Sequence, residues 1–466
     1  MKVKGVELMF EIDKLLKEVK RVHFIGIGGS GMCPLAEILH NEGYLLSGSD
    51  NNETDTLARI RDMGIPVTLG QKAENIDGAE MIVYTAALLP DNPELVAAKS
   101  SGIPTFERAE LLGAVTRMYD DCYCVCGTHG KTTVSSMLTQ IMIQCGKDPS
   151  AVIGGKLPLT QSNGRVGKTQ NMVCEACEFK DTFLRLSPDV AIILNVDADH
   201  LEYFKTLDNI ILSFNKFSKL TTKALIVNGD DANSLKAIAD VNDKKIITFG
   251  IDKKNDFYAE NIVVDHAFAG YDIFKNGEKL GHIKLKVPGE HNVYNSLAAL
   301  AAADYAGIEM ADAIKSLEQF GGACRRFEVL AEIDGITIAD DYAHHPAELK
   351  VTLDAAMQME FNTVWAVFQP FTYSRTKEHM EDFAKVLQIP DKCVMTEIMG
   401  SREINTDGVY TSQLAEKIPG SVWFNTFEEV AEHVLANVKS GDLVITLGCG
   451  DIYKAAKIMI NKLNSK

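Results

Sequence analysis

Apolar and polar positions along the chain follow two alternating periods, which predict strands and helices in turn. Apolar runs of strand length lie at 21–29, 45–50 and 80–87, and stretches with helical spacing separate them at 34–43 and 56–64. This βαβ rhythm predicts a parallel sheet covered by helices.

The same rhythm restarts near the end of the first quarter of the chain. An apolar strand, a glycine-rich turn and a helix occupy 122–146, and further buried strands are predicted at 189–200 and 223–231. The less regular segment 256–291 predicts antiparallel hairpins, and a helix at 295–308 closes this section.

A third series of strands, separated by helices, follows the segment "FGGACRRFEV" at 320–329, which has the composition of a linker. Its strands are predicted at 336–343, 363–370, 392–398 and 442–450. We therefore predict an α/β fold with three domains: a Rossmann-like domain over 1–115, a P-loop ATPase-like domain with a mostly parallel sheet over 116–327, and a Rossmann-like α/β domain over 328–466.

Composition narrows the class of protein. The 466 residues are enough for about three domains, the net charge is −17, and no block of Lys or Arg stands out. This argues against nucleic acid or an acidic membrane surface as the main partner. No apolar run approaches 18 residues and the N-terminus reads as a charged helix rather than a signal peptide, so we expect a cytoplasmic protein without membrane insertion.

The ten cysteines show no disulfide-framework spacing. Cys122, Cys124 and Cys126 alternate along one strand, which predicts a single buried face where cysteine acts as a small hydrophobe. Cys174 and Cys177 form one CxxC pair. A structural zinc site is the less favoured interpretation, because it usually needs two well-spaced ligand pairs.

The stretch "IGIGGSGM" at 25–32 has the pattern of a dinucleotide-binding turn. Gly26, Gly28 and Gly31 fit G-x-G-x-x-G, and Asp50 lies where an acid that binds a ribose hydroxyl is expected. Taken alone, this motif favours an NAD-dependent oxidoreductase.

"CGTHGKTT" at 126–133 is a phosphate site of a different kind. Val125 stands where the first Walker glycine would be, so the match is to a shorter G-T-x-G-K-T form. Backbone N–H groups at the glycines would approach phosphate, Lys131 would supply a cation, and the Thr132 hydroxyl could ligate Mg²⁺. The alternative is a glycine-rich turn with a solvated lysine.

Acidic and imidazole side chains follow two of the predicted strands. Glu175 and Glu178 lie in "CEACEF", while Asp197, Asp199 and His200 lie in "NVDADH". Ligand residues collect at this edge of a parallel sheet. His200 alone would be structural or exposed, but beside a P-loop it becomes a candidate metal ligand.

Six motifs together carry a resemblance over essentially the whole chain. "GTHGKTT", "EACE", "NVDADH", "PGEHNVYNSLAALAA", "GGACRRFE" and "DDYAHHPAEL" resemble, in order and spacing, the Mur ligases, ATP-dependent enzymes that form amide bonds in peptidoglycan synthesis. The resemblance implies that the N-terminal turn holds the diphosphate and uridine of a UDP-sugar rather than NAD. The residues so implied are Gly26, Gly28, Gly29, Ser30, Gly31, Ser49, Asp50, Asn92 and Arg108.

The resemblance also implies an ATP site and a magnesium site in the central domain. Thr132, Glu175 and His200 match positions that organise two magnesium ions. Asn292 and Asn295 would reach adenine, although helix capping explains Asn292 equally well. The implied ATP-binding residues are Gly127, Thr128, His129, Gly130, Lys131, Thr132, Thr133, Asn292, Asn295, Arg326 and Asp341.

Arg326, in the linker, matches the family arginine that faces the γ-phosphate, and Lys131 and His344 complete the implied catalytic set. A salt bridge within the linker is the alternative for Arg326. The motifs "DDYAHHP" and "FQPFTYSRT" imply an amino-acid site with Tyr342, His344 and Arg375. An arginine pairs naturally with a carboxylate.

Within the family, the motifs "GIGGSGM", "SGSD", "DDYAHHP" and "FQPFTYSRT" are most similar to the branch whose substrates are UDP-N-acetylmuramate and L-alanine. We expect the protein to be a monomer or a weak homodimer. Lys180 replaces an aspartate, and Phe371–Thr372 replaces a His-Arg pair, of other family members. Two alternatives stay open: a ligase that adds a preformed peptide during wall recycling, and a non-catalytic nucleotide sensor. An NAD oxidoreductase would leave the P-loop unexplained.

Overall fold

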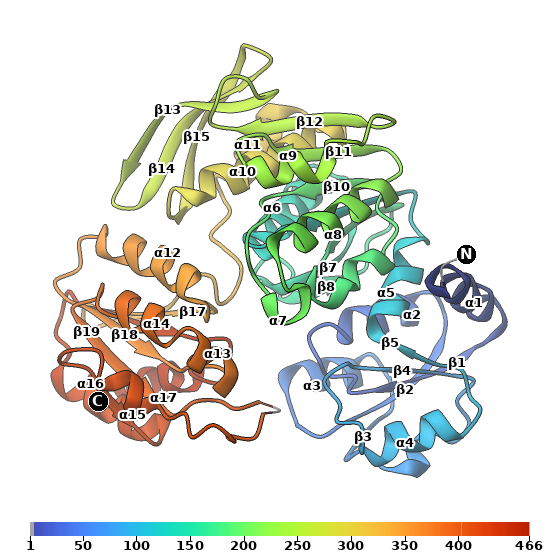
Figure 1. Ribbon diagram of the computed structural model, residues 1–466, viewed down its shortest axis with the longest axis horizontal. Helices are drawn as coiled ribbons and strands as arrows, with labels where there is room; N and C mark the ends of the chain where they lie inside the picture. Colours follow the sequence, from blue (N-terminus) through green and yellow to red (C-terminus); the bar gives the residue numbers. More distant parts are fainter. Residues whose placement is uncertain (1–3, 402, 466) are drawn as a thin grey trace. The chain divides into compact units, whose positions relative to one another are not determined.

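The computed structural model describes residues 4–401 and 403–465, and side chains from residue 11 onward. Figure 1 shows three β-sheets with helices packed against them, in the order that the sequence pattern predicts. Within the described residues, no helix is both long and apolar enough to cross a bilayer.

The first sheet has five strands in the order β3-β2-β1-β4-β5, and every neighbouring pair is parallel. The order reverses between β1 and β4, so the turn after β1 lies at a topological switch point, where α/β sheets bind ligands. The elements are α1 Lys4–Glu18, β1 Arg21–Ile25, α2 Cys33–Asn41, β2 Leu45–Asp50, α3 Asp55–Asp62, β3 Val67–Leu69, η1 Ala73–Ile76, β4 Met81–Tyr84, α4 Pro93–Ser100, β5 Thr105–Glu107 and α5 Arg108–Thr116.

The second sheet has ten strands in the order β15-β14-β13-β12-β11-β10-β6-β9-β7-β8. Its centre is parallel, with β6 between β10 and β9, and β7–β8 is an antiparallel pair. The elements are β6 Asp121–Cys126, α6 Lys131–Gln144, β7 Ser150–Leu157, β8 Ser162–Arg165, β9 Asn171–Glu175, η2 Phe179–Arg185, β10 Val190–Ile193, α7 Leu201–Phe204, α8 Leu207–Leu220, β11 Ala224–Asn228, α9 Ala232–Ile238, β12 Lys245–Gly250, β13 Phe257–Asp265, β14 Phe268–Lys275, β15 Glu278–Pro288, α10 His291–Tyr305 and α11 Met310–Leu317.

The third sheet has six strands in the order β16-β17-β21-β18-β19-β20, parallel except for the β16–β17 hairpin. Its elements are β16 Glu328–Ile333, β17 Ile336–Asp341, α12 Pro346–Met357, β18 Val364–Phe368, α13 Tyr373–Glu378, α14 Met380–Val386, β19 Lys392–Thr396, α15 Thr411–Ala415, β20 Val422–Phe424, α16 Phe427–Asn437, β21 Leu443–Leu447 and α17 Tyr453–Asn464. The α/β fold with mostly parallel sheets is thus confirmed.

The three sheets are grouped into two compact units. One contains the first sheet and most of the second, and the other contains 321–466 with the segments 263–270 and 284–292. The boundaries predicted at 115 and 327 remain predictions. The prediction for the cysteines is confirmed: Cys122, Cys124 and Cys126 are fully buried, belong to one apolar cluster and form no disulfide.

Candidate functional site

The turn between β6 and α6 requires glycine at two positions. Gly127 has φ +145° and Gly130 has φ +86°, values that side chains rarely adopt. A Cβ on Gly130 would lie 2.5 Å from Oδ1 of Asn295, and one on Gly127 would lie 2.9 Å from Leu194. The two glycines allow the chain to turn tightly from β6 into α6. The backbone N–H groups of the turn therefore lie at the carboxyl end of the sheet.

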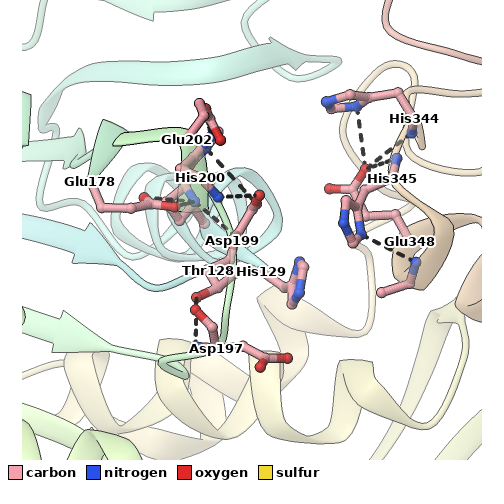
Figure 2. Close-up of polar contacts among 12 residues, drawn as sticks. Thr128, His129, Glu178, Asp197, Asp199, His200, Glu202, His344, His345 and Glu348 are labelled. Atoms are coloured by element: carbon pink, nitrogen blue, oxygen red, sulfur yellow. Dashed lines mark hydrogen bonds and ion pairs between the residues drawn. The ribbon is translucent and has the colours of Figure 1, made fainter. Parts of the chain in front are cut away.

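Asn195 holds this turn in place. It lies two residues after the end of β10. Its Oδ1 accepts a hydrogen bond from His129 N at 2.8 Å, its Nδ2 donates to His129 O at 3.1 Å, and its carbonyl accepts from Thr128 N at 3.0 Å. The Thr128 hydroxyl in turn accepts from Asp197 N at 2.9 Å, as Figure 2 shows. Two residues of the segment that follows β10 thus hold the turn between β6 and α6.

The Lys131 side chain folds back onto the turn. Its Nζ donates to Gly127 O at 2.6 Å and Thr128 O at 3.0 Å, and it lies 3.0 Å from Oε2 of Glu178. Burial lowers the pKa of Lys131, but the carboxylate of Glu178 and neighbouring anionic groups outweigh it, so the pKa is raised above its ordinary value. Lys131 is therefore a firmly charged cation on the turn between β6 and α6.

The three predicted metal-site residues lie on separate elements. Thr132 is buried at the start of α6, and Glu175 ends β9, where it accepts from Gly154 N at 2.9 Å. The His200 ring lies 4.6 Å from that of Phe179 and 3.4 Å from a Glu202 carboxylate oxygen. No three His, Cys, Asp or Glu side chains within the described chain form a ready metal cluster.

The donor types still suit a hard cation. Mg²⁺ prefers carboxylate and hydroxyl oxygens, which Glu175, Glu178 and Thr132 carry around the P-loop. Glu178 is 3% exposed, and its Oε2 accepts no hydrogen bond from the described residues although Lys131 lies beside it. The carboxylate and hydroxyl oxygens of these residues are therefore of the kind that magnesium binds.

The N-terminal turn has the geometry expected of a diphosphate site. Gly26 has φ +83°, and Gly28 N donates to an Asp50 carboxylate oxygen at 3.0 Å. A Cβ on Gly31 would lie 2.9 Å from the Arg108 side chain, which places that guanidinium beside the turn. Gly29, Ser30, Gly31 and Arg108 line a cavity of about 390 Å³.

This cavity also receives residues from the central sheet. Gly154, Glu175, Cys177 and Thr182 contribute to its lining. One cavity is therefore lined both by the glycine turn after β1 and by a carboxylate near the P-loop, a juxtaposition that sequence spacing alone could not predict.

Two of the predicted UDP-sugar residues do different work from the others. Ser49 is fully buried, and its hydroxyl donates to a Glu94 carboxylate oxygen at 2.7 Å. Asn92 is the N-cap of α4 and accepts from Glu94 N and Leu95 N. In this structure both side chains support the site from within the protein.

The two predicted adenine residues are buried on α10. Asn292 Nδ2 donates to Pro288 O at 2.7 Å, and both residues are at most 6% exposed. Asn295 lies against Gly130. Of the two asparagines, it is therefore the one beside the turn between β6 and α6.

In the second unit, two arginines and two aspartates lie around Tyr342. Arg325 pairs with Asp340 at 2.7 Å, whereas the Arg326 guanidinium lies 5.4 Å from the Tyr342 ring centre. Asp341 accepts from Phe327 N and Ala343 N, both at 2.7 Å. Burial raises the pKa of Asp341 to about 6, against the opposing effects of Arg326 and these backbone donors.

Of the adjacent histidines, His345 caps α12 and accepts from Ala347 N at 3.3 Å. His344 instead packs edge-on against Tyr342 and Phe371, and its Nδ1 lies 3.3 Å from a Glu348 oxygen (Figure 2). Burial lowers the pKa of His344, partly opposed by Glu348, so the imidazole is neutral at physiological pH.

Arg375 lies on α13, and the electrostatic field of its guanidinium reaches His344. Two of the three predicted amino-acid ligands, His344 and Arg375, therefore influence each other electrostatically.

Three family models cover most of the chain. The Mur ligase family catalytic domain matches residues 21–120, the Mur ligase middle domain 125–303, and the Mur ligase glutamate ligase domain 325–450. A protein named UDP-N-acetylmuramate--L-alanine ligase from Caldanaerobacter subterraneus subsp. tengcongensis is 41% identical over 454 residues, which is 96% of this chain and 98% of that protein. This chain belongs to the Mur ligase family.

Solved Mur ligase structures share its architecture. The UDP-N-acetylmuramate-alanine ligase of Thermotoga maritima matches with a TM-score of 0.82 at 29% identity, over 96% of this chain and 99% of that one. A murein peptide ligase from Psychrobacter arcticus 273-4 matches with a TM-score of 0.76 at 23% identity, over 96% and 99% of the two chains, which shows the shared fold alone.

Sequence reasoning about this Mur ligase missed Asn195 and understated Glu178. Asn195 opens the quoted motif "NVDADH" and stands at a strand end, the position where ligand and support residues collect. The signal was present, but only the fold places Asn195 against a turn 66 residues earlier in the chain.

Proposed function

We propose that the protein joins L-alanine to the lactyl carboxylate of UDP-N-acetylmuramate, with ATP converted to ADP and phosphate, as a step of peptidoglycan precursor synthesis. The observation that carries this proposal is the P-loop, complete with Lys131 and its acidic neighbours, beside a cavity that contains the diphosphate turn. Relatives that match over the full chain length carry the name of this activity.

In the proposed reaction, a carboxylate oxygen of the sugar attacks the γ-phosphorus of ATP and ADP leaves, which forms an acyl phosphate. The neutral amine of alanine then attacks the acyl carbon, and the tetrahedral intermediate loses one proton from nitrogen and expels phosphate to leave the amide. Lys131 stabilises the charge that develops on the β–γ bridging oxygen. Arg326 supplies a second cation for the transferred phosphoryl group.

The remaining residues bind and orient the substrates. Gly127 to Thr133 surround the phosphates of ATP, while Asn292, Asn295 and Asp341 take the rest of the nucleotide. Gly26, Gly28–Gly31, Asp50 and Arg108 hold the UDP-sugar, with Ser49 and Asn92 in support. The shared family supports these assignments, and the positive φ angles of Gly26, Gly127 and Gly130 support the phosphate contacts of the two turns.

Magnesium fits the acidic side of the P-loop. We propose that Thr132, Glu175 and His200 would hold two magnesium ions, which would supply positive charge to the two anionic substrates. For alanine, Arg375 pairs with the carboxylate, and the neutral His344 with Tyr342 lies beside it.

A ligase that accepts a preformed peptide is the second candidate, because its UDP-sugar and ATP requirements would be identical. A nucleotide sensor without turnover is the third, but Lys131, Glu175, His200 and Arg326 are all retained. We place the reaction in the cytoplasm, where both nucleotides are made, and propose a monomer or weak homodimer.

The decisive test measures ADP release from ATP and Mg²⁺ with UDP-N-acetylmuramate, with and without L-alanine, glycine or a tripeptide. We expect release that requires both the UDP-sugar and L-alanine, and a product heavier by one alanyl residue. Preference for the tripeptide would instead establish the peptide ligase. Binding of both nucleotides without amine-dependent turnover would establish the sensor.

A further inference from the structure

Three side-chain amides meet beyond the diphosphate turn, at the carboxyl ends of β2 and β3. Asn51 follows β2, Gln71 follows β3 by two residues, and Asn92 caps α4. The Oε1 of Gln71 accepts from Asn51 Nδ2 at 2.9 Å and from Asn92 Nδ2 at 2.6 Å. The N-cap role assigned to Asn92 above does not require these two hydrogen bonds to Gln71.

The backbone fixes which way these amides face. Asn92 Oδ1 accepts from the N–H groups of Glu94 and Leu95, both at 3.1 Å, and an N–H can bond only to an oxygen there. Nδ2 of Asn92 must therefore face Gln71, and Gln71 must accept this hydrogen bond with its Oε1. The orientation of one amide thus determines the other.

The Nε2 amino group is consequently the one polar group of the Gln71 side chain left to bind a ligand. A carbonyl oxygen has two lone pairs, and both of those on Oε1 are used. Within the described chain, Nε2 donates to no acceptor, and the residue is partly exposed. Gln71 therefore presents N–H donors, and no acceptor, to whatever binds beside it.

The support beneath this arrangement is rigid. Glu94 is fully buried; its Oε1 lies 2.7 Å from His23 Nε2, and its Oε2 accepts from Ser49 Oγ at 2.7 Å and Asn75 Nδ2 at 3.1 Å. These bonds connect β1, β2, η1 and α4. Rotation of the α4 cap would break several of them together.

The location is that of a nucleobase. The diphosphate turn follows β1, and Asp50 at the end of β2 lies where a ribose is bound. Gly70 N donates to Asp50 O at 2.8 Å, so Gln71 is two residues beyond that contact on the β3 side. A nucleoside that extends from the turn past Asp50 would reach Gln71 with its base.

We propose that Gln71 is a specificity-determining residue that donates a hydrogen bond to the C4 carbonyl of uracil, and that Asn92 is the positioning residue that orients it. This rests on the proposed function, because it takes a uridine nucleotide as substrate. Cytosine carries an amino donor where uracil carries that carbonyl, so two donors would meet and the base would be rejected.

The test measures binding of UDP and CDP by calorimetry to the wild-type protein and to Asn92→Asp and Gln71→Glu. Aspartate is an equally good N-cap, so the helix start is kept while the donor to Gln71 is lost. The Gln71 amide then turns its donor inward and its oxygen outward. We expect UDP affinity to fall about tenfold and the preference of UDP over CDP to shrink by at least that factor.

Gln71→Glu removes the donor directly and should also reduce the UDP-to-CDP ratio. Gln161→Glu, which adds the same charge on an exposed turn, is the matched control and should leave the ratio unchanged. Because the readout is a ratio, general loss of stability or added repulsion toward the diphosphate cancels.

An unchanged ratio in both variants, with UDP binding intact in the wild type, would overturn the role of Gln71 and leave the proposed function standing. Failure of the wild type to bind either UDP or UDP-N-acetylmuramate would overturn the proposed function, and the assignment of Gln71 with it.

Discussion

Asn195 offers a sharp test of how the phosphate-binding turn is held. Asn195→Ala removes two side-chain hydrogen bonds to His129, at 2.8 and 3.1 Å, and leaves the backbone bond from Thr128 N to Asn195 O in place. Each neutral hydrogen bond contributes about 1 kcal/mol, so the ordered turn loses about 2 kcal/mol. That corresponds to a roughly 30-fold weaker affinity for ATP.

The assay is the KM for ATP in the coupled measurement of ADP release, with UDP-N-acetylmuramate and alanine saturating. Asn228→Ala is the matched control: Asn228 ends the neighbouring strand, donates to Leu194 O at 2.9 Å and accepts from Asp230 N at 3.0 Å, without touching the turn. We expect the KM for ATP to rise with Asn195→Ala alone. Equal KM values for the two variants would refute the proposed role of Asn195.

Four further outcomes follow from the same geometry. Lys131→Met should lower kcat by about 10²–10³-fold while circular dichroism remains unchanged, and near-normal turnover would contradict its role. Thr132→Ala should raise the magnesium concentration for half-maximal activity, measured by titration after EDTA treatment, and an unaltered titration would remove Thr132 from the metal site. Arg375→Lys should raise the KM for alanine about tenfold or more and leave the KM for ATP alone, because lysine cannot pair in bidentate fashion; equal changes in both would count against it. Asp341 holds its proton more tightly when folded, with a pKa of about 6 against 3.8, so the free energy of unfolding should fall by about 3 kcal/mol as pH rises from about 4 to 6. Thermal melting across that range should show wild type losing stability relative to Asp341→Asn, and parallel curves would contradict the shifted pKa.

Local patterns in the sequence were sufficient wherever the relevant contacts are short in range. The strand, glycine turn and helix around Lys131 are consecutive, so the 24 residues 121–144 determine them and the structure confirms them. The alternation of Cys122, Cys124 and Cys126 likewise predicted one buried face, because side chains on a strand repeat every two residues. The order of the six motifs identified the family.

Only the tertiary structure decided which distant residues meet. Asn195 reaches a turn 66 residues away, Glu178 reaches Lys131 across 47 residues, and Glu94 reaches Ser49 across 45. Strand order brings these pairs together, and strand order is set by packing of whole sheets rather than by any local pattern. The sequence therefore determined the chemical groups and their local geometry, while the fold decided that Ser49 and Asn92 form hydrogen bonds with Glu94 and the start of α4, and that Oε1 of Gln71 accepts from two neighbouring amides.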